Sequence, residues 1–475
     1  MSQTDIKSNP ASGGNDAVYY ALAILVGTAT GLIGALFHIV VELLLNLHRT
    51  IRVAIENQLF ELAVFMGLSM AMVAVALYLT RRFAPEAGGS GVQEIEGALE
   101  GLREVRWLRV LPVKFVAGIA ALGSGLVLGR EGPTIHMGAA VGAATSTGVR
   151  LDDTERKGLI AAGAAAGLAA AFNAPLAAVL FIIEETRRQF PYTLKTYSAV
   201  ILASALSGFM TEEVAGVGPE LKILVQAPPL WHYPIFLVLG ALLGAFGVAF
   251  NRILLGCLDG TDRLTDRLPY LFPLVFAAIV GVLVSLLPDA TGGGDDFVYR
   301  MVHSPESYGL GLLLVIFAVR SVTTFGSYTC RIPGGIFAPM LALATLTGLI
   351  FGTVIALVVP GGSQLDAVGM AIAAMGGLFT GTVRAPLVGC VLVMELTGSY
   401  DLMLPTILTC VTANLAAHHL KGEPIYELLL DRTLRLARQT APHDKPQEDR
   451  VPIELGIGKG EEKETPPKKG EAPRD

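Results

Sequence analysis

Residues 128–138 read Leu-Gly-Arg-Glu-Gly-Pro-Thr-Ile-His-Met-Gly and lie within a long apolar region. Charged side chains such as Arg130 and Glu131 are costly in lipid, so their presence there indicates a functional site. Gly129 on one side and Pro133 on the other predict a break followed by a new helix, with Pro133 at an early helical position. A broken helix at membrane depth lines a cavity or is buried in protein, and its free amides favour an anion. The sequence therefore predicts an anion path with a carboxylate at its mouth.

The composition is that of a polytopic membrane protein. The 475 residues are 52% hydrophobic and only 16% charged, against about 25% charged in soluble domains. Apolar runs predict more than ten membrane segments, some of them short enough to be half-helices. The net charge of −6 argues against a nucleic-acid partner, and the four cysteines show no metal-ligand spacing. We expect no cofactor and no metal, and the motifs of soluble enzymes are missing, so we expect a protein that is not an enzyme.

Two stretches of the chain resemble each other. Residues 163–186 match 374–397, with Ala-Pro-Leu and a later Glu at the same offsets, and 129–133 match 335–339. Paired segments interrupted by Gly or Pro indicate a transporter whose binding site lies near the membrane midplane. The alternative is chance similarity between two Ala/Gly-rich membrane stretches.

The repeat separates two kinds of carboxylate. Glu184 has a counterpart in Glu395, which favours a structural role for both at a helix end. Glu131 and Glu185 have no acidic counterpart. The architecture alone does not demand this second pair, so they are the better candidates for chemistry.

Other polar residues near breaks have two interpretations each. Ser90 has the pattern of an N-cap with a capping box, or its hydroxyl faces an anion. Tyr426 follows the last apolar run, where a Tyr is usually a membrane-interface anchor. Lys114 lies inside an apolar run and has three interpretations: a buried counter-charge, a side chain that snorkels to the membrane surface, or the partner of a carboxylate.

Composition shifts divide the chain into successive parts. The Arg-rich connection 81–109 is predicted to be cytoplasmic. The predicted parts are a polar N-terminal tail 1–16, a first membrane repeat 17–218, a linker 219–230, a second membrane repeat 231–419, a short C-terminal helix 420–437 that reaches the pore, and a disordered cytoplasmic tail 438–475.

Three stretches in this order resemble the CLC family of chloride channels and chloride/proton antiporters: GSGVQEIEGALE (89–100), GREGPTIHMGA (129–139) and GGIFAPMLAL (334–343). The match extends over about 80–425. It implies an all-α polytopic membrane fold of two inverted-topology repeats with broken, tilted helices. It also implies a homodimer with one pore per subunit, chloride and other halides and protons as substrates, and a multi-pass location in a prokaryotic inner membrane.

The resemblance also implies roles for individual residues. Glu131 resembles the external gating glutamate and Glu185 the internal proton-transfer glutamate. The chloride ligands that it implies are the side chains of Ser90 and Tyr426 and the amides of Ile336 and Phe337. Gln93 departs from the family, which usually has Pro there, and could offer a donor near the inner vestibule.

We therefore expect a secondary active antiporter that exchanges chloride for protons and is gated by Glu131. The alternative within the family is a passive voltage- or proton-gated chloride channel. An intramembrane enzyme using Glu131 and His136 would show substrate turnover and no ion flux. A structural scaffold would tolerate replacement of Glu131 and Glu185.

Overall fold

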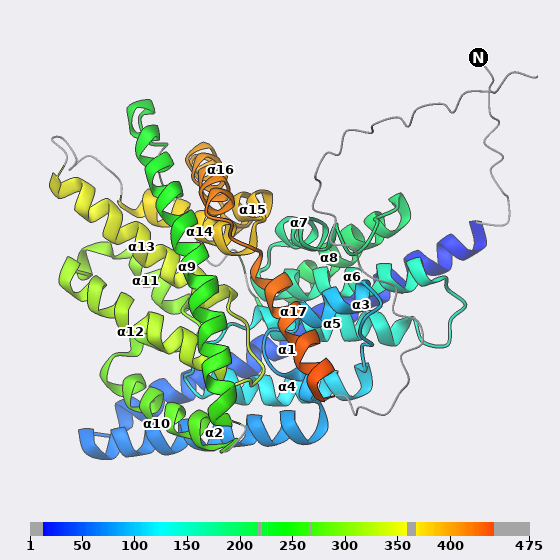
Figure 1. The fold of residues 1–475 in the computed structure, drawn as a ribbon, viewed down its shortest axis with the longest axis horizontal. Coiled ribbons are helices and arrows are strands. Elements are labelled where there is room, and N and C mark those ends of the chain that lie inside the picture. The colour runs from blue at the N-terminus through cyan, green and yellow to red at the C-terminus, as the bar shows by residue number, and fades with distance from the viewer. Residues whose placement is uncertain are drawn as a thin grey trace, which may run out of the picture. The chain divides into compact units, whose positions relative to one another are not determined.

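The computed structural model describes residues 13–216, 218, 221–223, 225, 227–265, 268–358 and 367–440. The predicted tail 438–475 lies outside these residues from 441 onward, as does the N-terminal tail up to residue 12. The described residues form seventeen α-helices (Figure 1). In chain order these are α1 Gly13–Ala54, α2 Gln58–Phe83, α3 Val92–Leu99, α4 Trp107–Gly123, α5 Glu131–Thr145, α6 Asp153–Phe172, α7 Pro175–Thr186, α8 Leu194–Ala215, α9 Tyr233–Thr265, α10 Leu271–Leu286, α11 Asp295–His303, α12 Leu310–Thr329, α13 Phe337–Val358, α14 Ala367–Val383, α15 Pro386–Thr397, α16 Met403–His419 and α17 Ile425–Thr440.

The first sixteen helices form two sets of eight, α1–α8 and α9–α16, that follow one another in matching order. Contacts match as well, since α5 packs on α6 as α13 packs on α14, and α1 packs on α8 as α9 packs on α16. Gly129 and Gly335, at the same position of the two sets, pair in an antiparallel bridge. The predicted all-α fold of two inverted repeats is confirmed.

Six helices within the described ranges are long and apolar enough to cross a membrane: α1, α2, α8, α12, α13 and the helix that includes α9. Others are shorter, including α10, α14 and α15. Of the helices that begin at Gly or Pro breaks, α5, α7 and α15 are shorter than a full span, whereas α13 is long enough to cross the membrane.

The predicted helix starts are confirmed in both sets. The chain breaks at residues 124–130, and α5 then begins at Glu131 with Pro133 in its first turn. In the second set α13 begins at Phe337, again two residues before a Pro. Pro175 and Pro386 are the first residues of α7 and α15. Pro is favoured at such positions because the N–H that it lacks would have no helical partner.

The two glutamates shared by the repeats cap helices of the opposite repeat. The Glu395 carboxylate, on α15, accepts hydrogen bonds from the N–H groups of Leu176 (3.0 Å) and Ala177 (2.7 Å) at the start of α7. The Glu184 carboxylate, on α7, accepts one from Val388 N–H (3.1 Å) at the start of α15. The prediction of a structural role at a helix end is confirmed, and the partner helix lies in the other repeat.

Glycine allows close helix packing in the first repeat. A side chain on Gly138 of α5 would collide with the carbonyl of Gly163 on α6, and one on Gly163 would collide with the carbonyl of Gly138. Small residues let helix backbones approach in this way within membranes. The backbone of α5, and with it Glu131, is thereby held against α6.

Candidate functional site: opposed helix N-termini

The starts of α5 and α13 meet in the interior of the first compact unit, which extends to Arg432. Gly129 N–H donates to Gly335 O, and Gly335 N–H donates to Gly129 O, both at 2.8 Å. The Glu131 side chain is fully buried, and its Oε2 accepts a hydrogen bond from Ala338 N–H at 3.4 Å. A carboxylate of the first repeat therefore lies on the helix N-terminus of the second repeat, where the helix dipole favours a negative charge.

Ile336 and Phe337 stand at the start of α13, and both are buried. The first amides of a helix have no carbonyl partner within it, so these N–H groups are available to an anion. The Phe337 ring packs against Phe172 and Phe379, with ring centroids 5.0 and 4.6 Å away. An apolar wall thus surrounds the amides and keeps water away from them.

Ser90 is buried in the loop before α3, and its hydroxyl has no hydrogen-bond partner among the described residues. The N-cap of α3 is Gly91, in the left-handed conformation at φ 94°, and it makes no side-chain cap. The predicted Ser90 capping box is therefore wrong. A methyl group on Gly132 would lie 2.8 Å from Ser90 Oγ, so the hydroxyl faces the start of α5 beside Glu131.

Tyr426 is only 1% exposed. Its ring makes an edge contact with Phe181 at 6.2 Å, and Phe181 in turn contacts Phe337 at 6.1 Å. The interpretation of Tyr426 as a membrane-interface anchor is therefore wrong. The structure gathers Tyr426 with the aromatic side chains around the start of α13.

Glu185 is buried at the C-terminal end of α7, and a second carboxyl group lies beside it. This group is Glu96 of α3, which is 0% exposed, and neither of its carboxyl oxygens has a hydrogen-bond partner among the described residues. Two buried carboxylates side by side repel each other, which favours a proton on one of them. The sequence prediction missed Glu96. The usable signal was a glutamate among the apolar residues of a short helix that directly follows the Ser90 loop.

Lys114 is fully buried, and its ammonium group donates to Ala87 O (2.9 Å) and Gly89 O (2.7 Å). The described residues place no carboxylate in an ion pair with Lys114. The role found, a buried cation that holds backbone carbonyls, was not among the predicted alternatives. Arg320 is its counterpart, because the same 206 residues separate Lys114 from Arg320 and Gly129 from Gly335.

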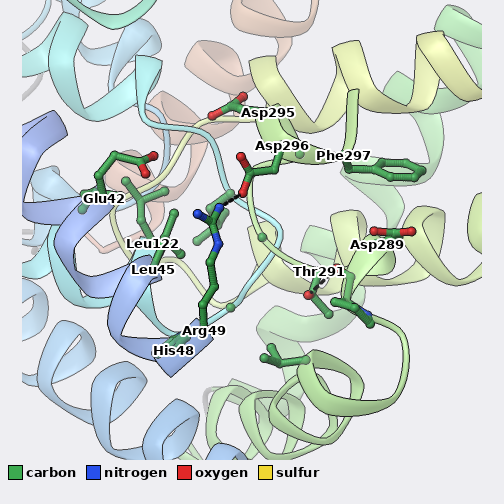
Figure 2. A pocket seen from close by; sticks show the side chains of 18 of the residues that line it. Glu42, Leu45, His48, Arg49, Leu122, Asp289, Thr291, Asp295, Asp296 and Phe297 are labelled. Atoms are coloured by element: carbon green, nitrogen blue, oxygen red, sulfur yellow. Dashed lines mark hydrogen bonds and ion pairs between the residues drawn. The ribbon is translucent and has the colours of Figure 1, made fainter. Parts of the chain in front are cut away.

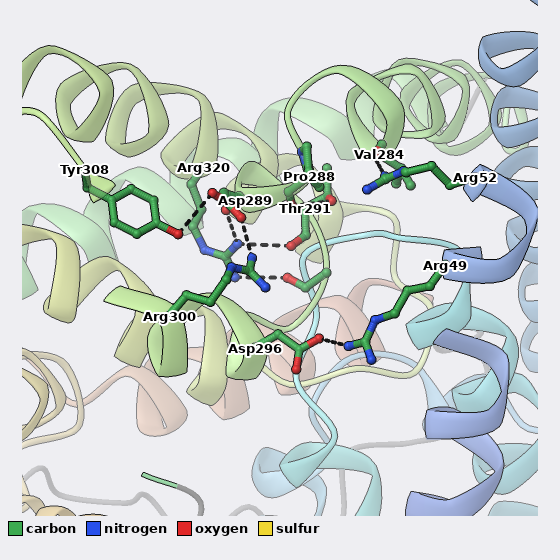
Figure 3. A network of polar contacts seen from close by, with 11 residues as sticks. Arg49, Arg52, Val284, Pro288, Asp289, Thr291, Asp296, Arg300, Tyr308 and Arg320 are labelled. Carbon is green, nitrogen blue, oxygen red and sulfur yellow. Dashed lines mark hydrogen bonds and ion pairs between the residues drawn. The ribbon is translucent and has the colours of Figure 1, made fainter. Parts of the chain in front are cut away.

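Arg320 holds the matching loop of the second repeat (Figure 3). Its guanidinium donates to the carbonyls of Asp289, Thr291, Gly292 and Gly293 at 2.8–3.1 Å. Beside it the Asp289 carboxylate pairs with Arg300 and accepts from Tyr308 Oη at 3.4 Å. Burial raises the pKa of Tyr308, which keeps this phenol protonated as a donor.

A cavity of about 410 Å³ lies beside this loop, with charged side chains on its walls (Figure 2). Glu42 and Arg49 line it from α1, Asp295 and Asp296 from the start of α11, and Arg130 from the residue before Glu131. Arg49 and Asp296 form an ion pair that joins the two repeats. If the Arg-rich connection 81–109 is cytoplasmic, inverted topology places this cavity on the outer side. The sequence prediction missed the cavity, because its walls come from distant segments.

Broken helices in inverted repeats, with their N-termini opposed around a buried carboxylate, define a membrane transport protein. Comparison with known proteins identifies the family. A family model described as voltage gated chloride channel matches residues 71–418. The chain belongs to this CLC family and is a multi-pass membrane protein.

Curated relatives and solved structures agree with this assignment. The H(+)/Cl(-) exchange transporters ClcA of Salmonella arizonae and Salmonella paratyphi B are each 44% identical over 429 residues, covering 88% of this chain and 89% of theirs. The crystal structure of a slow cyanobacterial Cl-/H+ antiporter has a TM-score of 0.83 and 36% identity, covering 88% of this chain and 98% of that one. A eukaryotic CLC transporter, with a TM-score of 0.73, 22% identity and coverage of 87% and 74%, shares the fold.

Proposed function

We propose that this protein is a secondary active antiporter that exchanges chloride for protons across the membrane. The observation that carries the proposal is the hydrogen bond from Ala338 N–H to the Glu131 carboxylate. A carboxylate that occupies a helix N-terminus competes directly with any halide that binds the same amides. The naming of similar proteins as H(+)/Cl(-) exchange transporters and as a Cl-/H+ antiporter supports this function.

The mechanism follows from competition between two anions. Ionised Glu131 occupies the start of α13 and excludes chloride by charge and by volume. A proton neutralises the carboxylate and removes its attraction to the helix N-terminus. The side chain then leaves, and chloride binds the amides of Ile336 and Phe337. Ser90 and Tyr426 donate hydroxyl hydrogen bonds on the cytoplasmic side of this position.

Protons reach the site along a route separate from that of chloride. Glu185 receives the proton from the cytoplasm, and the buried Glu96 carboxyl beside it supports this role, because two neighbouring buried carboxylates repel each other and favour a proton on one of them. Apolar residues and aromatic rings around Phe337 separate Glu185 from the anion position. The proton therefore crosses from Glu185 to Glu131 while chloride moves past Ser90.

The functional unit is a homodimer in a prokaryotic inner membrane, with a separate pore in each subunit. A passive chloride channel is the second candidate. It is favoured only by the description of the family model as a voltage gated chloride channel. The two candidates differ in whether proton movement is coupled to chloride movement.

Flux in proteoliposomes tests the proposal. Purified full-length protein is reconstituted with a chloride gradient and no initial pH gradient, and the internal pH is followed with a dye. We expect chloride efflux to drive protons inward until both gradients balance. Chloride efflux that leaves the internal pH unchanged would reject the antiporter and favour the channel.

A further inference from the structure

A proton that reaches Glu131 still has to enter the outer solution. The Glu131 side chain is fully buried, so its carboxyl group has no direct contact with solvent in this structure. The outer cavity lies close by, because Arg130, the residue directly before Glu131, lines it. A group that carries the proton from Glu131 into this cavity would complete the route across the membrane.

Asp295 lies between the outer cavity and the wall of the proposed anion position. It is the first residue of α11 and lines the outer cavity of about 410 Å³. It also lines a second cavity of about 20 Å³, whose walls include Phe172 and Ala338. Ala338 N–H donates to the Glu131 carboxylate at 3.4 Å, and Phe172 packs on the Phe337 ring. Asp295 therefore connects the outer cavity with the surroundings of Glu131.

The side chains around the small cavity single out Asp295. Within the part of the chain that the structure describes, it is the one residue that lines both cavities. The helices α13 and α14, which pack on α11, present apolar side chains there. The other lining residues are Phe172, Leu221, Val298, Ala338, Leu341, Met375 and Leu396. None of these side chains can accept a proton, so the Asp295 carboxylate is the acceptor at this position.

The next residue, Asp296, has a different environment. Its carboxylate pairs with Arg49 from α1, and its side chain is 62% exposed. Figure 2 shows the Asp295 side chain apart from this pair. Asp295 is half-buried, and no arginine or lysine of the described ranges forms an ion pair with it. The Asp295 carboxylate is thus open to a proton, whereas that of Asp296 already has a partner.

Positive groups hold the Asp295 carboxylate in place. A side chain on Gly294 would collide with the Arg320 guanidinium, so this buried cation lies against the residue directly before Asp295. The start of α11 also attracts a negative charge through the helix dipole. The other ionisable side chains that face the outer cavity are Glu42, His48, Arg49, Arg52, Arg130, Asp289, Asp296 and Arg300. None of these lines the small cavity beside Ala338, so Asp295 is the best placed to receive the proton.

We propose that Asp295 is the outer proton acceptor of the exchange cycle. The inference rests on the proposed chloride/proton exchange and adds a residue to its outer half. Protonated Glu131, having left the start of α13, donates to the ionised Asp295 carboxylate: the O–H bond of Glu131 breaks, and an O–H bond on Asp295 forms. Glu131 returns as an anion to Ala338 N–H and displaces chloride. Asp295 then releases the proton to water in the outer cavity.

Chloride flux from proteoliposomes at low buffer concentration tests this role. Asp295→Asn keeps the shape of the side chain but cannot accept the proton. Glu131 then releases its proton slowly, so we expect coupled flux to fall about tenfold or more, with the ratio of chloride to protons unchanged. Asp296→Asn is the matched control, because it removes the adjacent carboxylate, which lies in an exposed ion pair, and it should keep wild-type flux.

Rescue by imidazole, a small mobile base, distinguishes proton transfer from a structural role. Imidazole on both sides of the membrane can enter the outer cavity and replace the missing acceptor. Flux through Asp295→Asn should then rise toward the wild-type value, while flux through the wild type should not change. Wild-type flux in Asp295→Asn at low buffer concentration, or slow flux that imidazole does not restore, would overturn the role. If Asp295→Asn fails to fold, Asp295→Ser decides by the same measurements.

The same recordings separate this inference from the proposed function. Coupled transport by the wild type, together with an unimpaired Asp295→Asn variant, would remove Asp295 from the cycle and leave the antiporter in place. Chloride flux without proton movement in the wild type would reject the antiporter, and the role of Asp295 as a proton acceptor would fall with it.

Discussion

The loop before α3 and the loop before α11 are two copies of one structure with different side chains. Each has a 3₁₀ turn that begins with Pro, left-handed glycines at matching positions (Gly89 and Gly292, Gly91 and Gly294), and a buried cation holding its carbonyls. The first copy then presents Ser90 and Gln93, whereas the second presents Gly293 and Asp296. The glycines and cations therefore build the same frame in both loops, and the side chains that differ give each loop its own polar groups.

The starts of α5 and α13 also share a backbone structure but differ in one side chain. The helices α5 and α13 begin alike, but the first begins with Glu131 and the second with Phe337. The acidic side chain of one repeat reaches the amides of the other. A symmetric frame alone would give two equivalent helix ends. In the proposed mechanism, this one difference between the repeats makes the start of α13 the anion site and the start of α5 the source of its competitor.

Replacing Glu131 should have the largest effect on the coupling of proton flux to chloride flux. Glu131→Ala removes the competitor, so chloride flux should continue while proton coupling is lost entirely. Paired chloride-electrode and pH recordings in proteoliposomes measure both. Phe337→Leu changes the matching side chain without touching the backbone amides, and it should keep coupling. A coupled Glu131→Ala variant would refute the gate assignment.

Glu185→Gln should have the second-largest effect on transport. The amide keeps the shape of the side chain but cannot carry the transported proton, so proton flux should fall by about tenfold or more while chloride still passes. Glu184→Gln, at the adjacent residue, is the control, because Glu184 caps α15 in the opposite repeat. The assignment would be contradicted by equal proton fluxes in the two variants.

The two buried cations should differ in their contribution to stability. Arg320→Met leaves four loop carbonyls without their donor, whereas Lys114→Met leaves two. Each buried carbonyl left unsatisfied costs about 1–3 kcal/mol. Thermal unfolding in detergent should therefore show a larger fall in Tm for Arg320→Met, and the reverse order would contradict the comparison.

Removing either of the two helix caps made by Glu184 and Glu395 should have the smallest effect, and the two variants should lose similar stability. Glu184→Ala and Glu395→Ala each remove the acceptor at the start of a helix in the other repeat. Loss of such a cap costs about 0.5–2 kcal/mol. The two variants should lower Tm similarly and leave the ratio of chloride to protons unchanged. A change of that ratio in either variant would show that the shared glutamates do more than cap helices.

Sequence periodicity and repeats were sufficient to predict the broken helices, because Gly and Pro control helix starts locally. The repeat also separated the capping pair Glu184 and Glu395 from the unmatched Glu131 and Glu185. Contacts between segments far apart in the sequence could not be predicted from local patterns. The proximity of Glu96 to Glu185 depends on how α3 packs near the end of α7, and the burial of Tyr426 depends on the aromatic cluster. Local patterns gave Ser90 the wrong cap, since Gly91 fits the left-handed position better.

Bromide anomalous diffraction at the start of α13 tests the central claim most directly, because it locates the halide and the Glu131 side chain in one experiment. In wild-type crystals we expect no bromide at the Ile336 and Phe337 amides while the Glu131 carboxylate lies on Ala338 N–H. In Glu131→Gln crystals we expect bromide to fill that position with the side chain displaced. Full bromide occupancy in the wild type, with Glu131 still on Ala338, would contradict the competition between carboxylate and halide.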